Sequence, residues 1–167
     1  MVLDQSDILF SIAEIGATLA GFAALAGVLG SRGSRTATQN FANLWIVVLV
    51  SLALSFFSLV PVVVAEFGIS TFAVWRLSSA IFLLLMTLAL ALGMRHIIRP
   101  ASVLNWFGKG IVIPLVVLTD VLLLGNAIGI SEPYAAAWFL SVLLFYLALA
   151  GVNFILLLTA AFMPQDD

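Results

Sequence analysis

Five long apolar stretches dominate the chain and restrict what it can fold into. They cover residues 8–29, 44–65, 76–94, 111–129 and 135–161. An α-helix rises about 1.5 Å per residue, so about 20 apolar residues cross the hydrocarbon core of a bilayer. Each stretch is about that long. The pattern therefore predicts an all-α fold, a polytopic transmembrane helix bundle with about five spans.

The scarcity of charge supports the same class. Hydrophobic residues make up 64% of the chain and charged residues only 8%, whereas soluble domains carry about 25% charged residues. So few charges cannot cover a water-facing surface, and the outer surface is expected to face lipid. All connections between the stretches are short. Residues 1–167 are therefore predicted to form a single integral membrane domain.

The basic residues predict the orientation. Two loops hold five of the six Lys and Arg residues, namely Arg32, Arg35, Arg95, Arg99 and Lys109. Loops rich in Lys and Arg face the cytoplasm, so the N-terminus is predicted outside and the C-terminus in the cytoplasm. The N-terminal residues MVLDQSD lack a positive region, so the first stretch is expected to stay in the membrane. Arg95, Arg99 and Lys109 are expected to contact anionic lipid headgroups.

Composition also excludes several function classes. Cysteine is absent and His96 is the only histidine, so no metal site built from Cys and His is expected within one chain. Six basic residues without a patch do not suit nucleic-acid binding. The motifs HExxH and GxSxG, the P-loop and the dinucleotide fingerprint are all missing. The chain is therefore predicted not to be an enzyme and to hold no cofactor.

The first stretch combines a small face with a polar one. Helical spacing predicts a packing face of small residues, which can serve within the chain or between copies: Ala13, Ala17, Ala20, Ala24 and Gly27. In lipid, helices associate through close backbone approach at such residues. A second stripe is polar and includes Ser11, Glu14 and Thr18.

Glu14 is the residue that most needs an explanation. It lies roughly 7 Å from the middle of its stretch, where a carboxylate facing lipid is costly. It is therefore expected to face the bundle interior, a partner or water. One hypothesis is an ion or proton site, and the other is a structural hydrogen bond. Arg76 is the expected ion-pair partner, with Glu66 and Glu132 competing for it.

Two further polar residues fall within the fourth stretch. Asp120 lies near its middle with no basic residue predicted at the same depth, so it is expected to be protonated or reached by water. Asn126 lies in the same stretch and could line an ion or proton pathway, although an interhelical hydrogen bond is the favoured interpretation. In the second stretch, Ser51, Ser55 and Ser58 share one face, for which packing is favoured over a hydrated pathway.

Several stretches resemble an uncharacterised group of small multi-pass bacterial inner-membrane proteins. The resembling segments are AEIGATLAGFAAL from Ala13, FFSLVPVVVAEFGIS from Phe56, VWRLSSAIF from Val74, LGNAIGI from Leu124 and YLALAGVNFILLL from Tyr146. The resemblance implies a helical protein of the bacterial inner membrane. It transfers no reaction, substrate or functional residue.

Two function hypotheses follow. The first is a homo-oligomer that forms an ion or proton pathway, with the polar stripe around Glu14 lining the vestibule and Asp120 at the constriction. The second is a non-catalytic membrane module, such as an accessory subunit, scaffold or membrane-acting effector, that works with an unidentified partner protein. The lipid bilayer is the expected surrounding in both.

Overall fold

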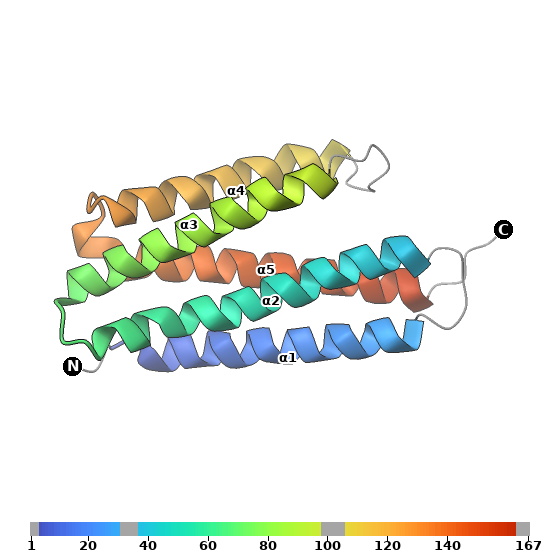
Figure 1. Cartoon of the computed structure of the whole chain (residues 1–167), viewed down its shortest axis with the longest axis horizontal. Helices are drawn as coiled ribbons and strands as arrows, with labels where there is room; N and C mark the ends of the chain where they lie inside the picture. The colour runs from blue at the N-terminus through green and yellow to red at the C-terminus, as the bar shows by residue number, and fades with distance from the viewer. Residues whose placement is uncertain (1–3, 31–36, 98–105, 163–167) are drawn as a thin grey trace. The chain divides into compact units, whose positions relative to one another are not determined.

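The computed structural model describes residues 4–30, 37–97 and 106–162, and these ranges consist of helices joined by short turns (Figure 1). Five α-helices and one 3-10 turn occur in the described chain. They are α1 (Ser6–Gly30), α2 (Ala37–Ala65), α3 (Thr71–Ile97), α4 (Trp106–Ala127), η1 (Glu132–Tyr134) and α5 (Ala135–Phe162). The predicted all-α class and the five helices are confirmed.

Four helical segments among the described residues are long and apolar enough to cross a membrane. They are Ser6–Gly27, Val47–Ala65, Thr71–Leu88 and Glu132–Leu156. The fourth predicted span corresponds to α4, a helix of 22 residues, in which the apolar segment among the residues with described side chains is Pro114–Ala127. These segments define a membrane-spanning protein, whereas its orientation in the membrane stays a prediction.

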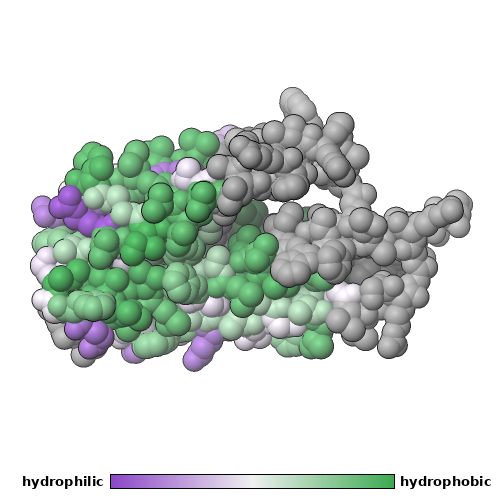
Figure 2. All heavy atoms as spheres, in the orientation of Figure 1, coloured by the Kyte–Doolittle hydropathy of each residue, from purple (hydrophilic) through white to green (hydrophobic). Residues whose placement is uncertain are grey.

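The surface of the helices agrees with a lipid surrounding. Large apolar side chains are exposed on every helix, among them Phe22, Leu52, Leu84, Val117 and Ile155. Figure 2 shows apolar residues over most of the described surface that faces the viewer. Exposure of this extent is unfavourable in water and favourable in hydrocarbon.

The described helices form two compact units. Unit 1 contains Val64–Val142, with α3, α4, η1 and the first residues of α5. Unit 2 contains Val2–Val63 and Leu143–Asp167, with α1, nearly all of α2 and the remainder of α5.

In unit 2, α1 lies against α2 through small residues. Gly16 is buried, and a Cβ placed on it would lie 2.6 Å from Ser55 Oγ and 2.8 Å from the carbonyl oxygen of Ser51. Ser55 Oγ donates a hydrogen bond to the carbonyl of Ala13, at 2.8 Å. The two backbones therefore approach closely because Gly16 has no side chain. Further along, Ala23 packs with Leu44 and Val47.

In unit 1, aromatic residues form the centre of the packing. Phe139 of α5 lies against two side chains of α3, with ring centroids 5.7 Å from Trp75 and 6.0 Å from Phe82. All three residues are almost completely buried. Aromatic pairs at such separations contribute beyond the area that they bury.

The N-terminus of α3 differs from the sequence prediction. The helix begins at Thr71, not at residue 76, so Arg76 lies in its second turn. Ser70 caps the N-terminus of α3, because its carbonyl accepts a hydrogen bond from the Val74 N–H at 3.0 Å and its Oγ accepts one from the Ala73 N–H at 3.4 Å. Hydropathy alone does not detect such a cap.

Candidate functional site

Glu14 lies on an exposed face of α1. Its side chain is exposed, as are those of the neighbouring residues on that side of the helix. This surface, the Glu14 face, consists of Ser11, Glu14, Ala17, Thr18, Gly21 and Ala24. Glu14, Ala17, Gly21 and Ala24 alternate by three and four residues, which places them in one line along the helix.

The depth of Glu14 makes this exposure costly. It lies eight residues after Ser6, so its Cα is about 12 Å along α1. The candidate span runs over Ser6–Gly27 and includes it. A charged side chain at the centre of a spanning helix costs about 2.5–3.5 kcal/mol on insertion scales. The carboxyl group therefore needs water, a proton or a polar partner.

The polar groups around Glu14 are engaged with their own helix. Ser11 Oγ donates to the carbonyl of Asp7 at 2.9 Å, and Thr18 Oγ1 donates to the carbonyl of Glu14 at 2.7 Å. Their oxygens can still accept hydrogen bonds. No partner for the Glu14 carboxyl group is found in the described part of the chain. The face thus presents acceptor oxygens without a protein donor.

The predicted small packing face is divided between two sides of α1. Ala13 and Ala20 are buried, and Gly27 is half-buried beside Leu44. Ala17 and Ala24 are exposed on the Glu14 face.

The buried line along α1 runs through Leu9, Ala13, Gly16, Ala20 and Ala23. It lies about 100° around the helix from the Glu14 face. Sequence reasoning missed Gly16 and Ala23. Their alternating spacing with Ala13 and Ala20 is the signal that indicates them.

Asp120 and Glu14 belong to different units. Asp120 is half-buried on α4 in unit 1, and Glu14 lies in unit 2. Within the described residues, no hydrogen-bond partner is found for the Asp120 carboxyl group.

Asn126 is the centre of a buried hydrogen-bond network in unit 1. Its side chain is only 1% exposed. Its Nδ2 donates to Ser79 Oγ at 2.8 Å and to the carbonyl of Ala135 at 3.0 Å, while its Oδ1 accepts from Ser131 Oγ at 2.7 Å. Both amide hydrogens are used. The network joins α3, α4 and the start of α5, which is the interhelical arrangement favoured from the sequence.

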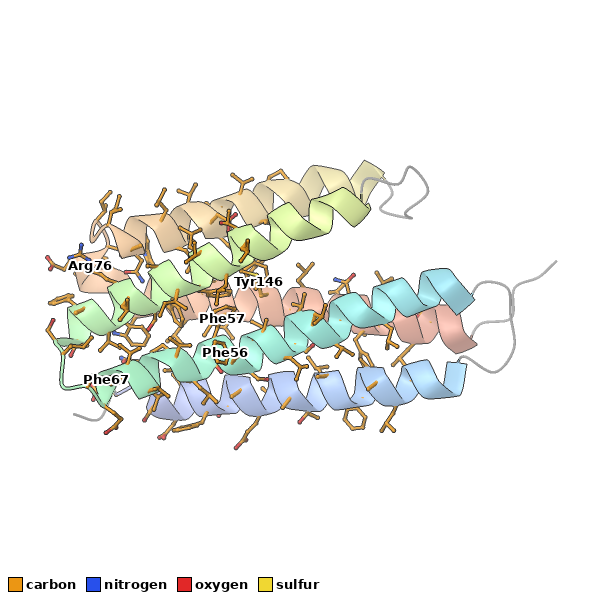
Figure 3. The ribbon with its side chains drawn as sticks, in the orientation of Figure 1. Phe56, Phe57, Phe67, Arg76 and Tyr146 are labelled. Carbon is orange, nitrogen blue, oxygen red and sulfur yellow. The ribbon has the colours of Figure 1, made fainter. Side chains whose placement is uncertain are left out.

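Arg76 is hydrogen-bonded to backbone. Its Nε donates to the carbonyl of Ala127 at 3.3 Å, and Figure 3 shows the side chain beside the connection that follows α4. Glu66 and Glu132 are exposed. Among the described residues, neither carboxylate forms an ion pair with Arg76.

The serines of α2 make packing contacts. Ser55 bonds across to α1, and Ser58 Oγ donates to the carbonyl of Ser55 at 2.9 Å. The Ser51 hydroxyl is buried without a hydrogen-bond partner in the described structure.

The remaining predicted sites lie beyond what is described. Arg99 and the side chains of Arg95 and Lys109, expected at lipid headgroups, are outside the described residues. A search of the described chain finds no group of three His, Cys, Asp or Glu residues that could hold a metal ion.

Comparison of the sequence with known protein families, curated proteins and solved structures finds no match. The resemblance to small bacterial membrane proteins therefore stays a prediction. The class of the chain, a helical membrane-spanning protein, follows from its own helices.

Proposed function

We propose that this protein is a non-catalytic subunit of a homo-oligomer, in which copies meet along the Glu14 face of α1 and form an ion or proton pathway there. The observation that supports the proposal is the exposure of Glu14 at about 12 Å along a membrane-spanning helix. A second copy covers this face and replaces lipid around the carboxyl group.

The shape of the Glu14 face suits a second helix. Ala17, Gly21 and Ala24 offer little side-chain volume, and no other part of the described structure lies within 4 Å of where a Cβ on Gly21 would stand. Helices in lipid associate where small residues allow close backbone contact. The alternation by three and four residues matches the spacing of a helix–helix seam.

The chemistry of the Glu14 face suits a proton or a cation. A carboxyl group binds either one, and the Ser11 and Thr18 oxygens keep lone pairs for a hydrated ion. Symmetry brings the carboxyl groups of several copies together. Rings of acidic side chains are a common device for cation selectivity. Asp120, half-buried on α4, is a further candidate for binding a proton or cation, taken by itself within unit 1.

An alternative occupant of the Glu14 face is a helix of a different membrane protein. The chain is then an accessory subunit, a scaffold or a membrane-acting effector. The same small residues favour it, because any helix with a compatible face can approach them. The resemblance to bacterial multi-pass proteins supports the bacterial inner membrane as the location in both cases.

Flux into sealed liposomes tests the pathway. We expect the wild-type protein to admit protons or monovalent cations and Glu14→Gln to lose most of that flux while keeping its oligomeric state. Glu132→Gln is the matched control, since it removes an exposed carboxylate from the 3-10 turn η1. Absence of wild-type flux over a range of voltage and pH would contradict the pathway and favour the accessory module.

A further inference from the structure

The Arg76 side chain of unit 1 lies against the C-terminal end of α4. A helix C-terminus carries partial negative charge on its free carbonyls, which attracts a cation. The Arg76 Nε–H donates to one of these carbonyls, that of Ala127, at 3.3 Å. The α4 terminus thus orients the guanidinium group.

Gly129 makes room for the guanidinium group. A Cβ on Gly129 would lie 3.2 Å from Arg76 Cζ, 3.3 Å from Nε and 3.4 Å from Nη1. The backbone at Gly129 has a φ of +87°, and its N–H donates to the carbonyl of Asn126 at 3.1 Å. A glycine is therefore favoured here both by the backbone conformation and by the closeness of the arginine.

The terminal N–H groups of Arg76 have no protein acceptor in the described chain. A guanidinium group has five N–H donors, and the structure uses the one on Nε. Glu66 and Glu132 do not pair with it, although both belong to unit 1. The side chain is exposed. The terminal guanidinium N–H groups are therefore held in place and are accessible to an acceptor outside the protein.

The surroundings of Arg76 are typical of a membrane interface. The connection after α4, beside Arg76, carries the exposed residues Ile130 (72%) and Tyr134 (64%), and the connection before α3 carries Phe67, which is 78% exposed. Arg76 itself lies in the second turn of a spanning helix. Aromatic residues and arginine at this level favour headgroup contact.

We propose that Arg76, held against Gly129 and the Ala127 carbonyl, binds the phosphodiester group of a phospholipid through its terminal N–H groups. Guanidinium and phosphate match in a two-bond geometry that a lysine cannot reproduce. The site is distinct from the pathway proposed for α1, because it uses none of the residues assigned to that pathway.

Lipid titration of the purified full-length protein tests this site. Native mass spectrometry measures binding of phosphatidylglycerol and of a galactosyl diacylglycerol with the same acyl chains. We expect the wild type to bind phosphatidylglycerol more tightly. Arg76→Gln should weaken that binding at least about tenfold, because it removes the charge and both hydrogen bonds of the two-bond contact, and leave glycolipid binding unchanged. Arg76→Lys should recover it only in part.

Two glycines provide a matched control. Gly129→Ala introduces a methyl group beside the guanidinium, whereas Gly68→Ala strains a backbone of similar φ, +71°, with nothing within 4 Å of its Cβ position. We expect Gly129→Ala to weaken phosphatidylglycerol binding and Gly68→Ala to leave it unchanged. Equal binding by wild type and Arg76→Gln would overturn the proposal.

Nitrogen-15 NMR of the arginine Nε groups detects lipid binding at Arg76 in the wild-type protein. The chain has five arginines, and the Arg76 signal is the one missing from Arg76→Lys. We expect phosphatidylglycerol in the micelle to shift that signal. An unmoved signal, or an equal shift with millimolar inorganic phosphate, would overturn the assignment to a lipid headgroup.

Discussion

At the scale of single residues, two glycines of α1 have opposite surroundings. Gly16 is buried against α2, where an added Cβ would meet Ser55 Oγ and the Ser51 carbonyl oxygen, while Gly21 has no described neighbour within 4 Å of its Cβ position. The same residue type thus serves a tight helix contact at one position and an open face at the other.

We expect Gly16→Ala to destabilise the fold and Gly21→Ala to leave it unchanged or slightly stabilised. Adding a methyl group to a filled contact costs about 1–3 kcal/mol, whereas alanine improves helix propensity by up to about 1 kcal/mol. Thermal or denaturant unfolding in detergent measures both free energies of unfolding. Equal stability of the two variants would contradict the close α1–α2 approach.

At the scale of helices, the connection between α4 and α5 depends on hydrogen bonds that hydropathy does not reveal. α4 ends where Ile130 N–H donates to the Gly125 carbonyl at 2.9 Å and Gly129 adopts a positive φ. The Asn126 side chain then joins this end to Ser79 of α3 and to the start of α5. One amide group therefore sets the arrangement of three helices.

Asn126→Ala should lower the free energy of unfolding by about 1–3 kcal/mol, because it removes three hydrogen bonds and leaves buried groups without partners. The control is Asn153→Ala, since among the described residues Asn153 Nδ2 donates only to the Leu149 carbonyl of its own helix, at 2.7 Å. We expect a much smaller loss there. Unfolding under the same detergent conditions compares the two, and similar losses would contradict the importance of the network.

At the scale of the whole molecule, the question is how the protein satisfies its exposed intramembrane acid. The surface is apolar on all helices, but Glu14 interrupts it on α1. Lipid provides no hydrogen bonds for a carboxyl group. Assembly of copies along α1 is the solution that we propose.

Gly21→Leu should therefore weaken assembly, since a bulky side chain separates two helices that meet at the Glu14 face. A loss of about 1–3 kcal/mol reduces the association constant by about 5-fold to 150-fold. Gly151→Leu in α5 is the matched control, because Gly151 also has no described neighbour within 4 Å of its Cβ position. Energy transfer between labelled copies in liposomes measures association. Wild-type association by Gly21→Leu would exclude this face as the interface.

Part of the candidate site could be predicted from the sequence. Glu14 stands out as an acid in an apolar stretch, and its distance from the helix start follows from residue number alone. Its exposure in the fold did not follow, because Ala13 and Ala17 look equivalent in sequence while only Ala13 is buried. The hydrogen bond of Arg76 to Ala127 was also missed, since the two residues are 51 positions apart.

The sequence by itself determined the class of this protein and its five helices. Apolar length and low charge require a membrane, and in lipid a helix satisfies its own backbone hydrogen bonds, so each span is specified locally. Only the tertiary structure decided which faces pack. Helix association in lipid depends on the fit of small residues such as Gly16 and on single polar contacts such as that of Asn126, and many apolar faces compete closely for the same role.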